Sequence, residues 1–265
     1  MAWTLAITGK GGVGKTTLAA LAVRWLNEHG RRPVLAVDAD PNTNLDVLLG
    51  VRVPSAVGSV REEVRQIAQS QAVSTGGMAK QQLLELKIQQ CLYETERFDL
   101  LAMGRPEGPG CYCYANNVLG AALRRLAGNY AAVVLDNEAG LENLSRRIMQ
   151  RVDHLLFVAD HSARGLATAR RLYDLAVEMR IEAGTMSVVV NRTRESPPGT
   201  PSPIPDWLDL VHQLFKNTRV SIAGGIPEDA EVIARDAAGE SIWTLPTESP
   251  VWIAAAEVFA RMMPA

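Results

Sequence analysis

The sequence GKGGVGKT at residues 9–16 stands between a short apolar run and a segment with helical periodicity. It fits the pattern G-x-x-x-x-G-K-[ST] of a phosphate-binding loop, in the strand, loop and helix setting that the pattern requires. Its glycines allow backbone N–H groups to surround a phosphate, at a helix N-terminus whose dipole favours anions. We expect Lys15 to reach the β- and γ-phosphates and the Thr16 hydroxyl to ligate Mg²⁺. The residues predicted to bind nucleotide here are Gly9, Gly11, Gly12, Val13, Gly14, Lys15, Thr16 and Thr17.

Around this loop, short apolar runs rich in β-branched residues alternate with helix-length segments. This alternation predicts right-handed crossovers and an α/β protein with the three-layer P-loop NTPase fold. Its mostly parallel central sheet is expected to have about seven or eight strands, with helices on both faces. The chain, 1–265, is expected to form a single P-loop ATPase domain, with a helical insertion at about 52–97 that holds no clear strand. The predicted strands are Trp3–Thr8, Pro33–Asp38, Phe98–Met103, Ala131–Asp136, His154–Ala159, Ser187–Asn191 and Arg219–Ala223, and the predicted helices are Lys15–Glu28, Asn117–Leu126, Leu141–Gln150 and Ala163–Arg180.

The composition and charge limit the compartment and the partners. A net charge of −2 argues against binding to a nucleic-acid backbone, which requires clustered positive charge. The N-terminal residues MAWTLAITGK lack the features of a signal peptide, and no apolar run reaches the ~18 residues of a membrane span. Three cysteines do not make a disulfide framework. We therefore expect a cytoplasmic protein with neither a nucleic acid nor a membrane as its partner.

A second lysine, Lys10, lies inside the loop, where ordinary phosphate-binding loops have no required cation. With it, the chain resembles the deviant Walker A ATPases, the family of the nitrogenase iron protein and of septum-site, chromosome-partitioning and metal-insertion ATPases. The resemblance implies a homodimer that encloses two nucleotides, in which Lys10 contacts the partner's phosphates. Such a lysine would neutralise charge on the leaving phosphates during hydrolysis. The alternative is an exposed loop lysine without that task.

The same resemblance gives roles to three aspartates that follow apolar runs. The sequence VDADPNTN, residues 37–44, resembles the family's first switch segment, which implies that Asp40 orients the attacking water and that Asp38 lies near the Mg²⁺ shell. Two aspartates at a strand end could instead cap the next helix. Asp136, in AAVVLDNEAG, corresponds to the Walker B aspartate that holds a Mg²⁺-bound water. Residues 137–140 would then form the second switch.

Two segments late in the chain resemble the family's base-binding elements. In SVVVNR, Asn191 has a side-chain amide that could read the edge of adenine, although asparagine is also an ordinary turn residue. In GGIPED, Pro227 and Glu228 would flank the base. The sequence contains no Asn-Lys-x-Asp set of the guanine-reading type, so ATP is favoured over GTP.

The sequence GRPEGPGCYCYANN, residues 104–117, places Cys111 and Cys113 on one side of an extended backbone. One such pair gives a soft metal only two thiolates, and a stable site requires about four. A two-fold dimer would bring a second pair to the axis and complete the set. A coincidental pair and a redox switch stay open as alternatives, whereas a disulfide between these neighbours would be strained. Cys91 lies in an expected helix and is interpreted as a buried small hydrophobe.

With the cysteine pair, the resemblance narrows to the maturation ATPases of carbon monoxide dehydrogenase and their relatives that serve acetyl-CoA synthase. It implies an Mg²⁺-dependent ATPase whose dimer depends on nucleotide and metal, and which binds Ni²⁺ or Zn²⁺ through Cys111 and Cys113. The metal would pass to a client nickel enzyme, carbon monoxide dehydrogenase or acetyl-CoA synthase, when hydrolysis loosens the switches. The chain departs from the expected second switch at Asn137 and Glu138, where small residues are typical.

Two other classes of protein fit the phosphate-binding loop. One is an electron-transfer ATPase with a [4Fe–4S] cluster shared by two subunits, but its ligands are far apart in sequence whereas Cys111 and Cys113 are adjacent. The other is a positioning ATPase of the septum-site or partition type. The C-terminal sequence VWIAAAEVFARMMPA lacks the basic face of a membrane-surface helix, and that class has no use for the two thiols.

Overall fold

The fold is described from a computed structural model of the whole chain. The structure describes residues 2–58, 86–104, 120, 123–141, 151–194 and 207–263. The cysteine pair at residues 111 and 113, the insertion between 59 and 85, half of the helix predicted at 117–126 and all but the first residue of the helix predicted at 141–150 lie outside these described ranges.

The centre of the structure is one eight-stranded sheet with the strand order β3-β4-β2-β5-β1-β6-β7-β8. All neighbours in this order are parallel except β3 and β4, which are antiparallel. The inner strands are apolar and buried on both faces, as parallel strands covered by helices must be. The predicted α/β fold is confirmed, and all seven predicted strands are present. The strands are β1 (Trp3–Gly9), β2 (Val34–Asp38), β3 (Leu92–Glu94), β4 (Asp99–Ala102), β5 (Ala132–Asp136), β6 (Arg151–Asp160), β7 (Glu182–Thr193) and β8 (Val220–Pro227).

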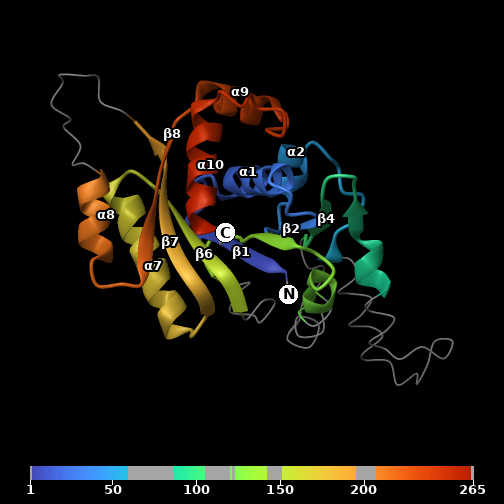
Figure 1. Cartoon of the computed structure of the whole chain (residues 1–265), viewed down its shortest axis with the longest axis horizontal. Coiled ribbons are helices and arrows are strands. Elements are labelled where there is room, and N and C mark those ends of the chain that lie inside the picture. Colours follow the sequence, from blue (N-terminus) through green and yellow to red (C-terminus); the bar gives the residue numbers. More distant parts are fainter. Residues whose placement is uncertain are drawn as a thin grey trace.

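Helices cover both faces of this sheet, as Figure 1 shows. Successive residues of each strand point to opposite faces, so that Leu5 and Ile7 pack on one side and Ala6 on the other. The first face is covered by α1 (Lys15–Glu28), α2 (Leu45–Leu49) and α10 (Pro250–Met262). The second is covered by α7 (Ala163–Glu178) and α8 (Trp207–Phe215), and α9 (Ala230–Ala238) lies above the sheet near α10 in Figure 1.

One expectation for residues 52–97 is wrong, because this segment contains the strand β3. The helix at 86–90 ends before Cys91, and Leu92–Glu94 then pairs antiparallel with β4 at the sheet edge. A three-residue edge strand is too short to show the alternation by which strands are recognised in a sequence. Cys91 is 4% exposed and belongs to the apolar core, which confirms its interpretation as a small hydrophobe.

The sheet brings the predicted phosphate, Mg²⁺ and base residues together at the end where its parallel strands terminate. Strands β1, β2, β5, β6 and β7 are parallel, so their carboxyl ends meet there, and ligands of open α/β sheets bind at that edge. The phosphate-binding loop follows β1 in the middle of this edge, and Asp38, Asp136 and Asn191 stand at the ends of β2, β5 and β7. Among the described residues, no helix is long and apolar enough to cross a membrane.

The packing of β6 generates a prediction about stability. Phe157 is fully buried in the second face of the sheet, where its ring contacts Tyr173 edge to face with the ring centroids 6.3 Å apart. We expect Phe157→Ala to lower the free energy of unfolding by roughly 3–5 kcal/mol, measured by chemical denaturation, since it leaves a cavity in a close-packed core. Ile253→Ala removes an apolar side chain that is 49% exposed and is the control, with an expected change below about 1 kcal/mol. Equal losses for the two variants would contradict this view of the core.

Candidate nucleotide site

The loop at residues 9–16 turns sharply between β1 and α1 and requires glycine at several positions. Gly12 and Gly14 have φ angles of 78° and 92°, a backbone conformation that residues with a Cβ rarely adopt. At Gly9, a Cβ would lie 2.4 Å from the carbonyl oxygen of Val158. Helix α1 has Gly14 as its N-cap and receives no side-chain capping bond there, so the N–H groups of its first turn are available to an anion.

Asn191, at the carboxyl end of β7, is hydrogen-bonded to this loop. Its Nδ2 donates a hydrogen bond of 2.8 Å to the carbonyl oxygen of Val13, and the residue is only 8% exposed. A Cβ on Gly14 would lie 2.3 Å from the same nitrogen. The side-chain amide that was predicted to read adenine is therefore already engaged through its nitrogen, and its role toward the base stays a prediction.

The two lysines of the loop have different surroundings. Lys15 is 7% exposed, and its Nζ donates to the backbone oxygen of Lys10 at 3.1 Å. Burial lowers the pKa of Lys15, and the negative charges of Asp136, Asp40 and Glu138 oppose this change. The side chain of Lys10 is exposed and makes no hydrogen bond or ion pair with the rest of the described structure. Lys15 thus points into the site, whereas the side chain of Lys10 is exposed outside it.

Asp38 and Asp136 lie side by side at the bottom of the site. They are register partners on the adjacent strands β2 and β5, and each is 1% exposed. The Asp38 carboxylate accepts hydrogen bonds from the backbone N–H groups of Asp40 and Leu45, at 3.0 and 2.9 Å. Neither carboxylate oxygen of Asp136 accepts a hydrogen bond within the described residues, although the Thr16 hydroxyl lies near enough to lower its pKa.

Burial dominates the ionisation of both aspartates. It raises the pKa of Asp136 to about 7, and the adjacent Asp38 carboxylate adds to the rise. Burial likewise raises the pKa of Asp38 to about 6, against backbone hydrogen bonds from Leu45, Asp40 and Asn44 that lower it. Buried carboxylate oxygens without a partner need a proton or a cation to offset their desolvation. Asp136, Asp38 and the Thr16 hydroxyl form an oxygen donor set of the kind that suits Mg²⁺.

A cavity of about 650 Å³ is lined by Lys15 and Thr16 and by residues that follow these two aspartates in the chain, among them Asp40 and Glu138. The phosphate-binding loop forms one side of it, and residues after β2 and β5 form the other. Asp40 is partly exposed in this wall, and its Oδ1 accepts a hydrogen bond of 2.8 Å from the backbone N–H of Asn42. Glu138 also lines the cavity, opposite the loop. The structure thus brings together the predicted phosphate, Mg²⁺ and water-orienting residues, namely Lys15, Thr16, Asp38, Asp40 and Asp136.

Asn137, which stands in the predicted second switch where a small residue is typical of the family, is hydrogen-bonded to β1. Asn137 is 1% exposed, and both its backbone N–H and its Nδ2 donate to the carbonyl oxygen of Ile7, at 3.1 and 2.9 Å. The Thr8 hydroxyl donates to the carbonyl oxygen of Gly140 at 2.6 Å, where the backbone turns with a φ of 103°. An asparagine in place of a small residue therefore anchors the start of the segment, while Glu138 is left facing the cavity.

A smaller cavity of about 260 Å³ adjoins the first and has the character of a base site. Pro227, Glu228 and Asn191, the three residues predicted to contact the base, line it together with the apolar residues Leu18, Leu21, Val232, Ile233 and Val251. Glu228 forms an ion pair of 2.8 Å with Arg194, which lowers the pKa of Glu228. The two cavities share the residues Gly14, Thr17, Arg192 and Asp236. The smaller, mainly apolar cavity suits the base of a nucleotide, and the adjoining polar cavity suits its phosphates.

Two residues that line both cavities, Arg192 and Asp236, were not predicted from the sequence. Arg192 follows Asn191 directly and has a φ of 57°, an uncommon conformation for a residue with a long side chain. Asp236 is on α9, far along the chain from the loop, and reaches both cavities because α9 lies over the site. No local pattern in the sequence marks either residue. Arg192 could have been noticed only as a cation next to the predicted base-contacting asparagine.

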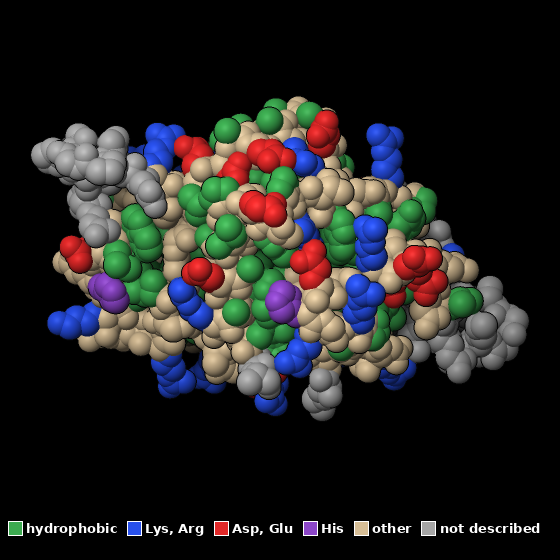
Figure 2. Space-filling model, turned by 45° about the horizontal axis from the view of Figure 1, so that its top comes forward, with side chains coloured by type: hydrophobic (Ala, Val, Ile, Leu, Met, Phe, Trp, Pro, Cys, Tyr) green, Lys and Arg blue, Asp and Glu red, His purple; other side chains and the backbone are tan. Residues whose placement is uncertain are grey.

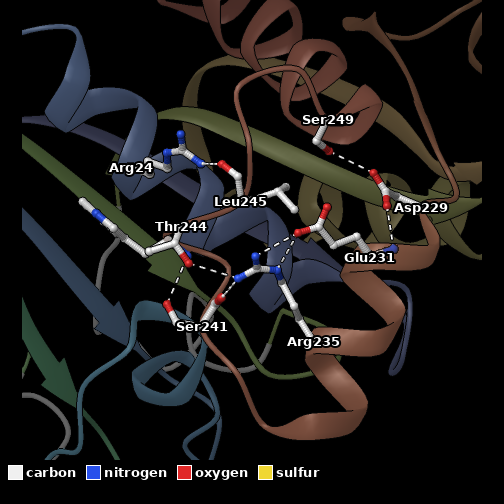
Figure 3. A network of polar contacts seen from close by, with 9 residues as sticks. Arg24, Asp229, Glu231, Arg235, Ser241, Thr244, Leu245 and Ser249 are labelled. Atoms are coloured by element: carbon white, nitrogen blue, oxygen red, sulfur yellow. Dashed lines mark hydrogen bonds and ion pairs between the residues drawn. The ribbon is translucent and has the colours of Figure 1, made fainter.

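Polar contacts help to hold α9 in this position, as Figure 3 shows, and the partly buried Val232 packs against the core. Helix α9 contributes no buried residue. Arg235 pairs with Glu231 at 2.8 Å and donates to the Ser241 carbonyl oxygen and to Thr244 Oγ1, both at 3.0 Å. At the start of the helix, the Ser249 hydroxyl donates to Asp229 at 2.9 Å. The wall that carries Asp236 is thus attached to the segment leading into α10.

The cysteine pair at 111 and 113 lies outside the described residues, so its predicted metal site has no geometry here. Within the described residues, no group of three or more His, Cys, Asp or Glu side chains could hold a metal ion. The site that the structure does define is therefore the one for the nucleotide.

The raised pKa of Asp136 predicts how stability changes with pH in the absence of nucleotide and Mg²⁺. Because this pKa lies above the value in the unfolded chain, the folded state binds the proton more tightly, and its stability falls as pH rises from about 4 through 7. Asp136→Asn removes the charge. We expect its gain in free energy of unfolding to be about 2–3 kcal/mol larger at pH 8 than at pH 5.

The measurement is urea denaturation at several pH values in buffer containing a chelator. Asp209→Asn, at an exposed position on α8, is the control and should show no such trend. A gain for Asp136→Asn that is the same at pH 5 and pH 8 would show that the buried carboxyl does not titrate in this range.

The sequence is similar to those of known nucleotide-binding proteins. Residues 4–242 match the family model of the CobQ/CobB/MinD/ParA nucleotide binding domain. An uncharacterized ATP-binding protein of Methanocaldococcus jannaschii is 38% identical over 259 residues, which are 98% of each chain. The carbon monoxide dehydrogenase accessory protein CooC of Rhodospirillum rubrum is 30% identical over 253 residues, covering 91% of this chain and 89% of that protein.

Solved structures show the same fold. The cell division protein MinD of Aquifex aeolicus superposes with a TM-score of 0.67 at 23% identity, over 99% of this chain and 97% of that one. A ParA family ATPase of Chlorobium tepidum gives a TM-score of 0.70 at 18% identity, over 98% of both chains. The chain therefore belongs to the CobQ/CobB/MinD/ParA family of nucleotide-binding domains and is an ATP-binding P-loop ATPase.

Proposed function

We propose that this ATPase binds a soft metal ion, with Ni²⁺ as its cargo, and delivers it to a client enzyme of the carbon monoxide dehydrogenase or acetyl-CoA synthase type. The observation that carries the proposal is the pair Cys111 and Cys113 in a chain that is 30% identical to the carbon monoxide dehydrogenase accessory protein CooC. Two neighbouring thiolates are a half-site for a soft metal, and a second copy of the chain would complete it. Zn²⁺ suits the same ligands and is the competing cargo.

In this proposal the described residues hold ATP and assist its hydrolysis. The loop N–H groups and the Lys15 ammonium bind the phosphates, and Asn191 keeps the loop in shape through Val13. Asp136, Asp38 and Thr16 would hold Mg²⁺, which neutralises charge on the phosphates when it is bound. Asp40, partly exposed in the cavity wall, orients the attacking water. The exposed side chain of Lys10 reaches the phosphates of the partner subunit.

A direct backbone link connects the phosphate side to the segment that carries the cysteines. The N–H of Met103 donates to the carbonyl oxygen of Asp38 at 2.8 Å, just after β4 leaves the sheet beside β2. Gly104 follows with a φ of 60°, and a Cβ there would lie 2.5 Å from the Cβ of Ala56. The chain that leads to Cys111 therefore starts against the strand end that holds Asp38. Loss of the γ-phosphate can act on both through this strand end.

A positioning ATPase is the second candidate, because the septum site-determining protein MinD of Bacillus subtilis is 27% identical over 238 residues. Two observations weigh against it. The apolar side of α10, including Trp252 and Phe259, packs in the core and does not form a free membrane-binding face. The face drawn in Figure 2 carries acidic and basic side chains interspersed, whereas binding to a DNA backbone requires clustered positive charge.

The metal claim is tested with a double variant of the cysteine pair. We expect Cys111→Ser/Cys113→Ser to weaken Ni²⁺ binding at least a hundredfold, because hydroxyls are poor ligands for a soft metal. The measurement is an anaerobic Ni²⁺ titration of the reduced protein, with and without a non-hydrolysable ATP analogue. In the wild type, the analogue should tighten binding and give one metal per two chains.

Cys91→Ala is the matched control, since Cys91 is buried in the core and has no place in the proposed site. It should bind Ni²⁺ as the wild type does. If the double variant also bound Ni²⁺ with unchanged affinity, the cysteine pair would not be the metal site and the metal-delivery function would fail, while the ATPase activity would still stand.

The role of Lys10 is tested separately. Lys10→Ala should retain ATP binding by one subunit but lose the ATP-dependent dimer and at least about tenfold in the rate of hydrolysis, since the lysine acts across the interface. Sedimentation velocity and phosphate release measure the two effects. Lys216→Ala, at an exposed position after α8, is the control and should change neither. If the Lys10→Ala protein dimerised and hydrolysed ATP normally, Lys10 would be an exposed loop lysine without a role across the interface.

A further inference from the structure

A third cavity, of about 660 Å³, lies at the opposite end of the sheet from the nucleotide. Its lining comes from the amino ends of β6, β7 and β8 and from the end of α7. Since these strands are parallel and the nucleotide site is at their carboxyl ends, the whole length of the sheet separates the two sites. The volume falls in the range of known small-molecule sites. ATP binding and hydrolysis do not account for this cavity.

Three exposed arginines in its lining form no ion pair within the described residues. Arg151, Arg180 and Arg219 line the cavity with one acidic residue, Glu182. Arg151 and Glu182 are register partners on β6 and β7, yet they form no ion pair. None of the three guanidinium groups makes a hydrogen bond or ion pair with any residue that the structure describes. Five other arginines of the described ranges form ion pairs, namely Arg24, Arg170, Arg194, Arg235 and Arg261, whereas Arg164 and Arg171 form none there.

The backbone at Arg180 is a second and independent sign. Arg180 has a φ of 53° and follows the end of α7, where the N–H of Ile181 returns to the carbonyl oxygen of Ala176 at 3.0 Å. This position after a helix strongly favours glycine, because a Cβ is disfavoured in the left-handed region. An arginine here places a cation at the cavity at the expense of backbone strain, and strained residues cluster at binding sites.

Apolar side chains complete the lining and indicate what kind of anion would fit. Val177, Ile181, Met186 and Tyr173 line the cavity, and the apolar side chain of Val177 is 54% exposed. We propose that the cavity binds a small organic anion, with a phosphate or carboxylate head held by the arginines and an apolar body against Val177, Ile181 and Met186. Guanidinium groups bind both of these heads in a fork geometry that an ammonium cannot provide.

The test is a fluorescence titration of the full chain with anilinonaphthalenesulfonate, a sulfonate anion with an apolar body, in saturating MgADP so that the nucleotide site is occupied. The wild type should bind one probe per chain. Arg180→Gly should weaken binding about tenfold while keeping or raising the melting temperature, since glycine relieves the backbone strain. Arg151→Gln/Arg219→Gln should weaken it at least as much. Arg171→Gln removes an exposed α7 cation outside the lining and should match the wild type.

Equal affinity in all four proteins, or no saturable binding in the wild type, would overturn the proposal. Competition then identifies the head group. Displacement of the probe by phenyl phosphate or by phenylacetate, but not by phenol, supports an anion site and shows which head it prefers. If phenol displaced the probe as well as the two anions, or if none of them did, the arginines would not form an anion site.

Discussion

Two buried carboxylates on adjacent strands are the constraint on which the rest of the site depends. Asp38 and Asp136 are register partners across β2 and β5, almost completely buried, and Asp136 has no hydrogen bond from any described residue. Two like charges in such a place are costly unless protons or a cation offset them. We propose that Mg²⁺, bound with ATP beside Lys15, supplies this positive charge.

Hydrogen bonds around the two aspartates connect segments that are far apart in the sequence. Asn191 connects β7 to the phosphate-binding loop through Val13, and Asn137 connects the end of β5 to β1 through Ile7. Met103 connects the exit of β4 to Asp38. Each link is a hydrogen bond made by a residue at or just after the carboxyl end of a strand, and all three lie at the same end of the sheet. A change in the charge at the phosphates can therefore reach several loops at once, including the one that leads to the cysteines.

Much of this could be predicted from the sequence, because the informative features are local. The glycines of residues 9–16 encode the loop by their backbone freedom, and the apolar runs encode strands that are buried on both faces. The parts that were missed depend on tertiary structure. The edge strand β3 is too short to show a period, and Asp236 reaches the site because tertiary contacts hold α9 over it. Likewise, no pattern in the sequence shows that the amide nitrogen of Asn191 is engaged with Val13.

The central claim is that ATP at this site assembles a thiolate cage from two chains. X-ray absorption at the nickel edge tests it most directly, on protein loaded with one Ni²⁺ per two chains and a non-hydrolysable ATP analogue with Mg²⁺. The account predicts a first shell of about four sulfur atoms, two from each chain. It also predicts that this shell loses sulfur neighbours when ADP replaces the analogue. A first shell of nitrogen and oxygen alone, or a sulfur shell that is the same with both nucleotides, would contradict it.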